Sequence, residues 1–426
     1  MNVLVFSEAS WDDKNSFGNT VSNFFSGKVW EEDRFCNFYA RKQMPDNTLL
    51  VDYYNLSAFD IVKGILRLRI RGKRFTTQDV ENQNETLFPS HDKEQKNIDK
   101  LHQKKNEFIY YGHEQIWRSK LWINQYFKSF ILDNAPDILF AFATSPYILW
   151  PLIHFLKKNS NCKVVLLVAD DVYESYDHCA IYRQGYLKRE FWKCIQSADK
   201  LYGISDEMSK LYETQFGKSI TTLYKGCDLS VEPKQYLNQP LRFVYAGNLL
   251  WGRDDTLALV AEALEELNQE GMEATLEIYT GTTVTESLQR KLNRGNSSRI
   301  MGSRTYDKIK QIMHEADVVL HVESFDNKAI DTVRYSFSTK IIDCLQSGNQ
   351  IVGIGPDGIA SINYLKKVDG AIVIDELNAI KAVIVELTKN RDLLTINADN
   401  TRKYASEHHD INVVRNKLRK DFLSLE

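Results

Sequence analysis

The chain has 426 residues, 43% of them apolar, and this length fits two α/β domains better than a single core. Its 54 Lys and Arg residues nearly balance 57 Asp and Glu residues, so a globally basic nucleic-acid binder is not expected. The 12% of aromatic residues exclude a disordered chain. The composition therefore indicates a large, soluble, folded protein.

The six cysteines form no C-x-x-C pair and no cluster with histidines. Reduced thiols in a cytoplasmic protein are therefore expected, rather than a zinc site or a disulfide framework. The apolar run at residues 3–6 is too short for a signal peptide, and no run reaches the ~18–20 apolar residues that cross a bilayer. We expect no metal and no resident cofactor.

Short apolar runs alternate with longer amphipathic stretches, which predicts repeated βαβ units and parallel sheets. In the first half, strands are predicted at residues 2–6, 35–39, 49–53, 137–142, 163–168 and 200–204. Helices are predicted at residues 16–25, 108–132, 146–158, 182–197 and 205–216. The polar segment 76–106 shows no sustained period and is predicted to be an excursion from the domain.

A second α/β unit begins near residue 241. Its strands are predicted at 242–246, 275–279, 317–322, 350–354 and 371–374, and its helices at 254–267, 305–313 and 339–346. The sequence thus predicts an N-terminal domain at 1–232, a C-terminal domain at 233–410, and a helix at 411–426 that could return to the first domain. Both domains should be Rossmann-like and doubly wound, and face each other across a cleft.

Ligands of such sheets bind at the carboxyl ends of the strands, so the loops there are the places to search. Gly247 ends one predicted strand, and Arg253 follows six residues later at a predicted helix start. A guanidinium beside free helix amides suits phosphate oxygens. A plain turn glycine and a solvated arginine are the alternative interpretation.

A second loop carries Ser338, Thr339, Lys340 and Asp343. Ser338 is predicted to be the N-cap of the following helix, and Lys340 and Asp343 share one helix face because they are three residues apart. That face offers a cation to a diphosphate and a carboxylate to a ribose diol; the alternative is an exposed ion pair worth ~0.3–0.5 kcal/mol. Glu323, just past a strand, either accepts sugar hydroxyls or is an ordinary loop acid.

Together these loops resemble the donor-binding half of the GT-B glycosyltransferases, specifically the retaining family 4 type that uses nucleotide-sugars. The segment 247–253 matches the spacing of that family's Gly-Arg-Leu-x-x-x-Lys loop. Arg253 takes the place of the lysine that contacts the diphosphate, and Asn248 stands where the family commonly has an arginine. Residues 299–317 are similar to the family's stretch beside the nucleobase, and the resemblance assigns Arg304 to donor binding.

The family's paired glutamates also have counterparts. Glu323 matches the first of the two glutamates. Asp343 matches the second, as in a variant of the family with a shorter sequence motif around that position. The segment between Glu323 and Asp343 is longer than in the usual motif. In the first domain the resemblance implies that Gly18, at a predicted helix start, approaches the donor diphosphate. Asp170 and Asp171 follow a strand where many relatives carry a histidine near the sugar, so one of them is expected in the catalytic neighbourhood; the alternative is a capping turn.

The resemblance implies a hexosyl-transferring enzyme of polysaccharide biosynthesis. It would move a sugar from a nucleoside-diphosphate sugar, UDP rather than GDP, to a glycan or lipid-linked acceptor, with retention and without metal. Cations and helix amides would stabilise the leaving diphosphate. A UDP-sugar 2-epimerase of the same architecture and an inactive binding subunit are the alternatives, whereas a dinucleotide oxidoreductase is disfavoured because no Gly-x-Gly-x-x-Gly follows a predicted strand.

The stretch from residue 60 to 75 interleaves aliphatic residues with six basic ones, namely Lys63, Arg67, Arg69, Arg71, Lys73 and Arg74. Such a pattern suits the surface of an anionic inner leaflet or a lipid diphosphate headgroup. The alternative is a surface helix whose apolar stripe packs on the sheet, although Gly64 and Gly72 weaken a long helix. We therefore expect peripheral membrane contact through this stretch.

Overall fold

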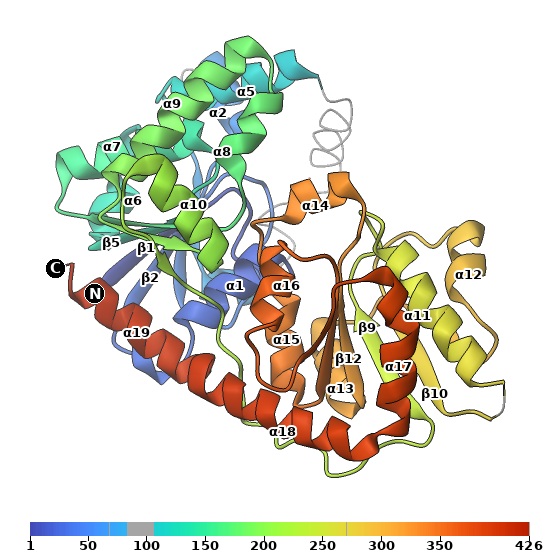
Figure 1. Cartoon of the computed structure of the whole chain (residues 1–426). Coiled ribbons are helices and arrows are strands. Elements are labelled where there is room, and N and C mark those ends of the chain that lie inside the picture. The colour runs from blue at the N-terminus through green and yellow to red at the C-terminus, as the bar shows by residue number, and fades with distance from the viewer. Residues whose placement is uncertain (68, 83–105, 270, 426) are drawn as a thin grey trace. The chain divides into compact units, whose positions relative to one another are not determined.

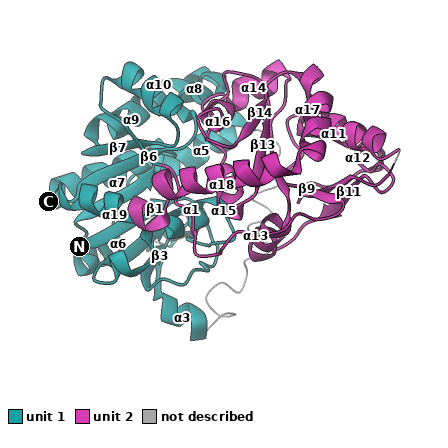
Figure 2. Cartoon of the chain, turned by 60° about the horizontal axis from the view of Figure 1, so that its bottom comes forward, with its two compact units in different colours: residues 1–223, 415–426 teal, residues 224–414 magenta. Residues whose placement is uncertain are grey.

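The computed structural model describes residues 1–67, 69–82, 106–269 and 271–425. Within them the chain divides into two compact units (Figure 2), which we call unit 1 (residues 1–223 and 415–426) and unit 2 (residues 224–414). Each unit has its own sheet, flanked by helices (Figure 1). The predicted α/β class with two Rossmann-like domains is confirmed.

The sheet of unit 1 has the strand order β4-β3-β2-β1-β5-β6-β7-β8 and is parallel apart from β4, which runs antiparallel to β3. The strands are β1 (Asn2–Ser7), β2 (Arg34–Tyr39), β3 (Val51–Asn55), β4 (Lys73–Thr76), β5 (Ile138–Phe142), β6 (Lys163–Val168), β7 (Lys200–Gly203) and β8 (Thr221–Thr222). The helices are α1 (Ser16–Phe25), α2 (Ala58–Leu66), α3 (Thr77–Asn82), α5 (Glu107–Arg118), α6 (Gln125–Asn134), α7 (Pro146–Asn159), α8 (Val172–Ser175), α9 (Ile181–Ser197) and α10 (Asp206–Phe216).

Aromatic side chains fill both faces of this sheet, because successive residues of a strand point to opposite sides. On β2, Phe35 packs against Phe25 of α1, with ring centroids 5.4 Å apart. Phe38 packs on the other side, against Trp122 and Phe127, at 5.2 Å and 5.0 Å. One strand therefore anchors two helical layers.

The predicted helix at 108–132 is wrong in its middle, where the structure has two helices, α5 and α6. Asn124 is the N-cap of α6, and its side chain accepts from the amide of Tyr126 at 2.9 Å. The buried Trp122 lies between the helices, and its indole N–H donates to the Trp117 carbonyl at 2.9 Å. A local cap and a buried ring thus divide a segment that is apolar enough to read as one helix.

The basic stretch at residues 60–75 is also divided, between a helix and a strand. The short helix α2 begins with a capping box between Ser57 and Asp60, and it ends before the edge strand β4. Of the predicted excursion at 76–106, the structure describes the end of β4, the helix α3 and Asn106, while 83–105 lie outside the described residues. None of the helices in the described part of the chain combines the length and apolarity that crossing a bilayer requires.

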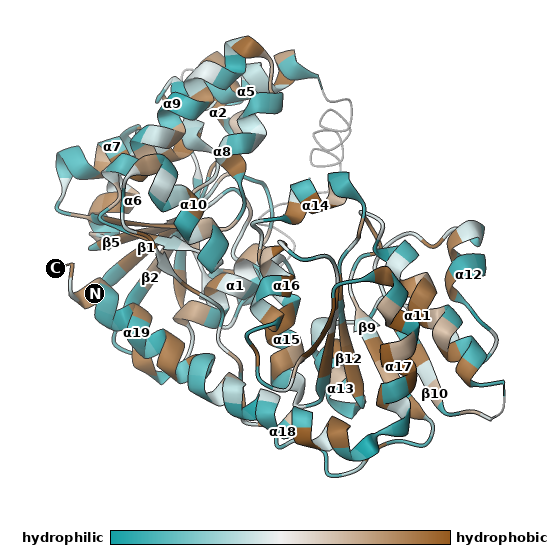
Figure 3. Ribbon diagram, in the orientation of Figure 1, coloured by the Kyte–Doolittle hydropathy of each residue, from teal (hydrophilic) through white to brown (hydrophobic). Residues whose placement is uncertain are grey.

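Unit 2 holds a parallel sheet with the strand order β11-β10-β9-β12-β13-β14. The strands are β9 (Leu241–Ala246), β10 (Ala274–Tyr279), β11 (Ser298–Gly302), β12 (Val318–Val322), β13 (Gln350–Ile354) and β14 (Ile372–Ile374). The helices are α11 (Arg253–Leu267), α12 (Glu286–Leu292), α13 (Tyr306–Glu315), α14 (Asn327–Val333), α15 (Lys340–Ser347), α16 (Ala360–Leu365), α17 (Ile380–Lys389), α18 (Arg391–His408) and α19 (Ile411–Leu423), the last of which continues into unit 1. The central strands of the unit 2 sheet are hydrophobic (Figure 3), and they pack with α11 and α17 in one core.

The segment 225–240 contains Gly226, Pro233 and Pro240, a composition that predicts an inter-domain linker, but it belongs to unit 2. The carboxylate of Asp317, fully buried before β12, forms an ion pair with Lys234 and accepts from the backbone amides of Asn238 at 3.1 Å and Arg242 at 2.7 Å. The segment is therefore fixed to unit 2, and the division at residue 223 stands nine residues before the boundary placed at 232.

The chain returns to unit 1 within α19. Phe422 of this helix lies within aromatic contact distance of Phe25, Trp30 and Phe140, at 5.9–6.3 Å between ring centroids. Its Arg419 donates to the buried Asp33 at 2.9 Å. Residues more than 380 positions apart in the chain thus complete one core.

Replacement of Asp317 by Ala should destabilise unit 2 by about 3–5 kcal/mol, because it leaves Lys234 and two amides buried without their acceptor. Hydrogen exchange of β9 and β12 in increasing urea measures the change. The control is Glu266→Ala, which removes an ion pair with Lys381 whose side chains are 51% and 60% exposed and should cost less than about 1 kcal/mol. Equal effects of the two substitutions would contradict the assignment.

Candidate functional site

The strand order of unit 2 reverses between β9 and β12. Open α/β sheets bind ligands outside the carboxyl ends of the strands at such a reversal. The loop after β9 contains Gly247, Asn248 and Arg253, and Glu323 directly follows β12. The structure therefore brings the first and third predicted loops together at the expected point of the sheet.

Arg253 is placed by a sharp turn and then held by the side chains of Glu323 and Asn248 and by the Val322 carbonyl, which accepts from its Nε at 3.2 Å. Trp251 and Gly252 both have left-handed backbone angles, with φ of 62° and 74°, and α11 begins at Arg253. The guanidinium donates to Glu323 Oε2 at 2.7 Å and 3.1 Å and to Asn248 Oδ1 at 2.8 Å. With its side chain only 11% exposed, Arg253 is a fixed cation and not a solvated surface arginine.

Glu323 is buried, with 5% of its side chain exposed, and faces Arg253 on one side and His321 on the other. Its Oε1 lies 3.4 Å from His321 Nε2. Burial raises the pKa of Glu323, but contact with His321 and with the Arg253 guanidinium outweighs it, so the pKa lies below its ordinary value. Glu323 is therefore an ionised group that orients Arg253.

Lys340, the first residue of α15, reaches the turn after β9. A Cβ atom added to Gly247 would lie 2.6 Å from Lys340 Nζ and 2.7 Å from the Tyr245 hydroxyl. Tyr245 is itself fixed, because it is buried and its hydroxyl donates to the Asn248 carbonyl at 2.6 Å. Glycine is therefore required at 247 so that the ammonium can approach the strand end.

The electrostatic setting of Lys340 is unusual for a lysine. Burial and the neighbouring Arg253 charge lower its pKa, and the more distant Glu323 and Asp343 oppose them. Among the described residues the half-buried ammonium has no ion pair and no hydrogen bond. Within the part of the chain that the structure describes, Lys340 thus carries its charge without an ion-pair partner.

The predicted N-cap at Ser338 is wrong, because α15 begins one residue later. Thr339 is the N-cap, has right-handed helical backbone angles, and makes no side-chain cap hydrogen bond. Ser338 instead donates its amide to Ser361 Oγ at 2.9 Å. The residue type favours Ser338 as the cap, but in the structure its amide is bonded to α16 and the helix begins after Thr339.

Asp343 lies one turn along α15 from Lys340, in a half-buried position. The Tyr306 hydroxyl donates to its Oδ1 at 2.7 Å. Burial raises the pKa of Asp343, while the buried Lys225 and the Tyr306 hydroxyl lower it in part. Burial in turn lowers the pKa of Lys225. The predicted surface pair with Lys340 is therefore replaced by a carboxylate shared among α15, α13 and the segment before β9.

Arg304, the remaining donor-site prediction, is exposed after β11, and its Nη1 donates to the Ser303 carbonyl at 2.8 Å. It precedes Tyr306 by two residues, so the predicted nucleobase stretch does lie beside Asp343. The sequence reasoning missed Tyr306 and Lys225; a tyrosine at a predicted helix start and a lysine in a presumed linker carry no signal of their own.

In unit 1, Asp170 and Asp171 follow β6 as expected. Asp171 is the N-cap of α8, where it accepts from the Glu174 amide at 3.3 Å and from the Tyr212 hydroxyl at 3.0 Å. Asp170 is exposed. The capping role therefore falls to Asp171, which leaves Asp170 as the aspartate whose side chain faces solvent.

Gly18 lies in the first turn of α1 and is buried. Its amide donates to the N-cap Asn15 at 2.8 Å, and a Cβ atom at Gly18 would lie 2.1 Å from the Asp12 carbonyl oxygen. The close passage of the preceding loop accounts for glycine here. Whether the other amides of this turn bind phosphate stays a prediction.

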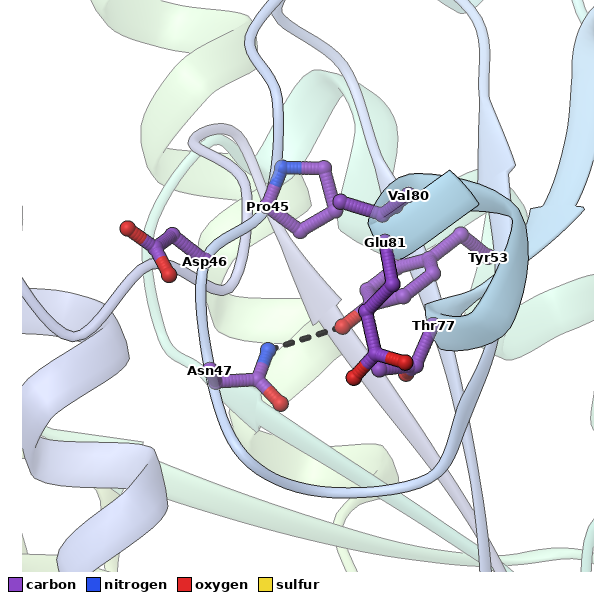
Figure 4. Close-up of a pocket in the computed structure, with 7 residues that line it drawn as sticks. All are labelled: Pro45, Asp46, Asn47, Tyr53, Thr77, Val80 and Glu81. Carbon is purple, nitrogen blue, oxygen red and sulfur yellow. Dashed lines mark hydrogen bonds between the residues drawn. The ribbon is translucent and has the colours of Figure 1, made fainter. Parts of the chain in front are cut away.

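Within the described ranges, no three His, Cys, Asp or Glu side chains are grouped so that they could hold a metal ion. A small pocket in unit 1 is lined by Pro45, Asp46, Asn47, Tyr53, Thr77, Val80 and Glu81 (Figure 4). None of the predicted site residues lines it, and its Asn47 amide donates to the Tyr53 hydroxyl at 2.7 Å.

Comparison with known proteins identifies the fold. No protein-family description and no curated protein sequence matches the chain. Among solved structures, it matches sucrose-phosphate synthase from Thermosynechococcus elongatus with a TM-score of 0.64 and 10% identity, covering 99% of this chain and 98% of that one. It matches HepE from Anabaena in complex with UDP with a TM-score of 0.65 and 12% identity, covering both chains fully.

A third match is the UDP-forming α,α-trehalose-phosphate synthase from Burkholderia xenovorans in complex with glucose-6-phosphate, with a TM-score of 0.56, 10% identity, and coverage of 99% of this chain and all of that one. These chains have the GT-B fold, so the predicted GT-B architecture is confirmed along the whole chain.

Replacement of Gly247 by Ala should destabilise unit 2 by about 1–3 kcal/mol, because the added methyl overlaps the Lys340 ammonium and the buried Tyr245 ring. Thermal unfolding measures the change. The matched control is Gly281→Ala after β10, where an added Cβ atom meets nothing within 4 Å. If both variants unfold alike, the close approach of Lys340 to Gly247 is not a feature of the folded protein.

Proposed function

We propose that the chain is a glycosyltransferase that takes a sugar from a nucleoside-diphosphate sugar, UDP rather than GDP, and transfers it to a glycan or lipid-linked acceptor. The transfer would proceed with retention and need no metal. The observation that carries the proposal is Lys340, a half-buried ammonium without a matched counter-charge at the strand reversal of unit 2. A diphosphate is the ligand that such a site lacks.

The diphosphate would lie against Lys340 and the first turn of α15. No side chain caps that turn, and although the amides of Ile341 and Ile342 already donate to the carbonyls of Ser338 and Thr339, the helix dipole there favours an anion. Arg253 adds a second positive charge, although Glu323 neutralises part of it. Arg253 is held in place before the ligand arrives, and a positioned cation of this kind stabilises charge on a departing diphosphate.

The nucleoside would lie beside Asp343. A carboxylate with remaining acceptor capacity can bind the two hydroxyls of a ribose, and the Tyr306 contact orients it. Arg304 is exposed two residues before Tyr306, on the side where a base would extend. The choice of UDP is supported by the neighbours, since HepE is in complex with UDP and the trehalose-phosphate synthase is UDP-forming.

In the reaction, the bond between the sugar C1 and the diphosphate breaks as an acceptor hydroxyl bonds to the same face of C1. The hydroxyl proton leaves with the released nucleoside diphosphate or passes to solvent. The described residues contribute positioning and charge stabilisation, so no protein nucleophile is required. Asp170 stays the unit 1 candidate near the sugar.

The test is UDP binding measured by titration calorimetry. The wild-type protein should bind UDP, and Lys340→Ala should weaken binding at least tenfold, because a charge-assisted hydrogen bond to phosphate is worth about 1.5–3 kcal/mol. The control is Lys381→Ala, which removes the same charge from an exposed ion pair of unit 2. Absence of UDP binding by the wild-type protein, or equal affinity of Lys340→Ala, overturns the donor site.

Catalysis is tested separately by incubation with UDP-N-acetylglucosamine alone. A glycosyltransferase with no acceptor present should release at most UDP and free sugar slowly. Appearance of the 2-epimer of the nucleotide-sugar would instead assign the chain to the epimerase alternative.

We further propose that unit 1 contacts an anionic membrane through α2. Apolar side chains that a packed helix would bury are exposed on this helix, with Phe59 at 45% and Leu66 at 81%. Lys63 and Arg67 are exposed beside them, whereas Arg74 is held by Asp52 and Asp133. Lys63 Nζ lies 5.9 Å from the centre of the Phe59 ring, and exposed apolar groups next to exposed cations favour an anionic lipid surface.

Sedimentation with vesicles of phosphatidylcholine and phosphatidylglycerol tests this contact. The double variant Lys63→Ser with Arg67→Ser should bind at least tenfold more weakly, because each basic side chain contributes about 1 kcal/mol near an anionic surface. The control is Arg290→Ser with Lys308→Ser, which removes two exposed charges from unit 2. The proposal is contradicted if the Lys63→Ser, Arg67→Ser variant binds the mixed vesicles as tightly as the wild-type protein does. It is also contradicted if the wild-type protein binds pure phosphatidylcholine vesicles equally well.

A further inference from the structure

The sheet of unit 1 has its own strand reversal, between β1 and β5. Its carboxyl edge is therefore a second place where an open α/β sheet binds a ligand. Glu8 directly follows β1, and Ser145 follows β5 by three residues. The two residues thus flank the reversal, as Arg253 and Glu323 do in unit 2.

The carboxylate of Glu8 is the centre of a polar cluster. Its Oε1 accepts from the Ser145 hydroxyl and, at 2.9 Å, from the Tyr147 hydroxyl. Its Oε2 pairs with Arg41 at 3.3 Å. An ionised carboxylate has about four acceptor positions, so three donors leave capacity for a further hydroxyl.

This cluster is built into the fold and yet open to solvent. Ser145 has a left-handed backbone, with φ of 48° and ψ of 56°, a conformation that residues with a side chain rarely adopt. Burial and the neighbouring Glu8 raise the pKa of Tyr147 well above its ordinary value, so its hydroxyl remains a proton donor. The Glu8 side chain is nevertheless 26% exposed, and Arg41 49% exposed.

A purely structural role would not need the exposed carboxylate. The backbone of Glu8 already fixes the neighbouring loop, since its carbonyl accepts from the amides of Ala40 at 3.1 Å and Arg41 at 2.8 Å. The side chain is held by donors on one oxygen and presents the other toward solvent beside a cation. A carboxylate held in this way has acceptor positions left for hydroxyl groups of a ligand.

We propose that Glu8 is a sugar-binding residue of unit 1, and that Ser145 and Tyr147 orient its carboxylate. The bound sugar would be the hydroxylated acceptor of the transfer, and this part of the proposal rests on the proposed function. The site itself does not, because it predicts sugar binding whether or not unit 2 binds UDP.

The test is saturation-transfer NMR with free glucose, galactose, mannose and N-acetylglucosamine. The wild-type protein should bind at least one of them saturably, and Glu8→Gln should weaken that binding at least tenfold. Tyr147→Phe keeps the carboxylate but removes one donor that orients it, and should weaken binding less than Glu8→Gln does. Glu32→Gln, an exposed glutamate of the same unit, is the control that leaves sugar binding unchanged.

Thermal unfolding of each variant reports whether unit 1 remains folded, and UDP titrations of the same preparations report on unit 2. No saturable sugar binding by the wild-type protein, or undiminished binding by folded Glu8→Gln, overturns the Glu8 site. Sugar binding that depends on Glu8 in a protein that does not bind UDP would support this site and overturn the proposed donor site instead.

Discussion

The close approach of one ammonium to one glycine organises the second unit. Lys340 can reach the end of β9 only because residue 247 has no side chain, and the buried Tyr245 prevents the strand end from moving away. Arg253 and Glu323 form the adjacent pair, in which the carboxylate holds the guanidinium in place. The result is a site in which burial and a neighbouring guanidinium both disfavour the charged form of Lys340.

The two units repeat one plan with different chemistry. Each places a glutamate beside the reversal of its strand order, but Glu323 is buried against Arg253, whereas Glu8 is partly exposed among hydroxyl donors. Burial and a cation suit the first carboxylate to an orienting role. Exposure and spare acceptor capacity suit the second to direct contact with a hydroxylated ligand. The fold places each glutamate at the strand reversal, and the neighbouring side chains determine what that glutamate can bind or orient.

Much of this could be predicted from sequence because it depends on local pattern. Short apolar runs identified the central strands, and the spacing from Gly247 to Arg253 located the first site loop. The errors arose where contacts made in the folded chain accompany a departure from the local signal: the Ser338 amide bonds to Ser361 while α15 begins after Thr339, and the buried Trp122 lies within a predicted helix. Tyr306, Lys225 and Glu8 could not be chosen from sequence, since only the folded chain brings their partners near.

The discontinuous make-up of unit 1 has a consequence for the nascent chain. Phe422 contributes a ring to the same aromatic core as Phe25 and Trp30. During synthesis those early residues emerge long before the helix that covers them, while all of unit 2 is still to be translated. The core of unit 1 therefore stays incomplete, with part of it uncovered, until the ribosome has synthesised the final turns of α19.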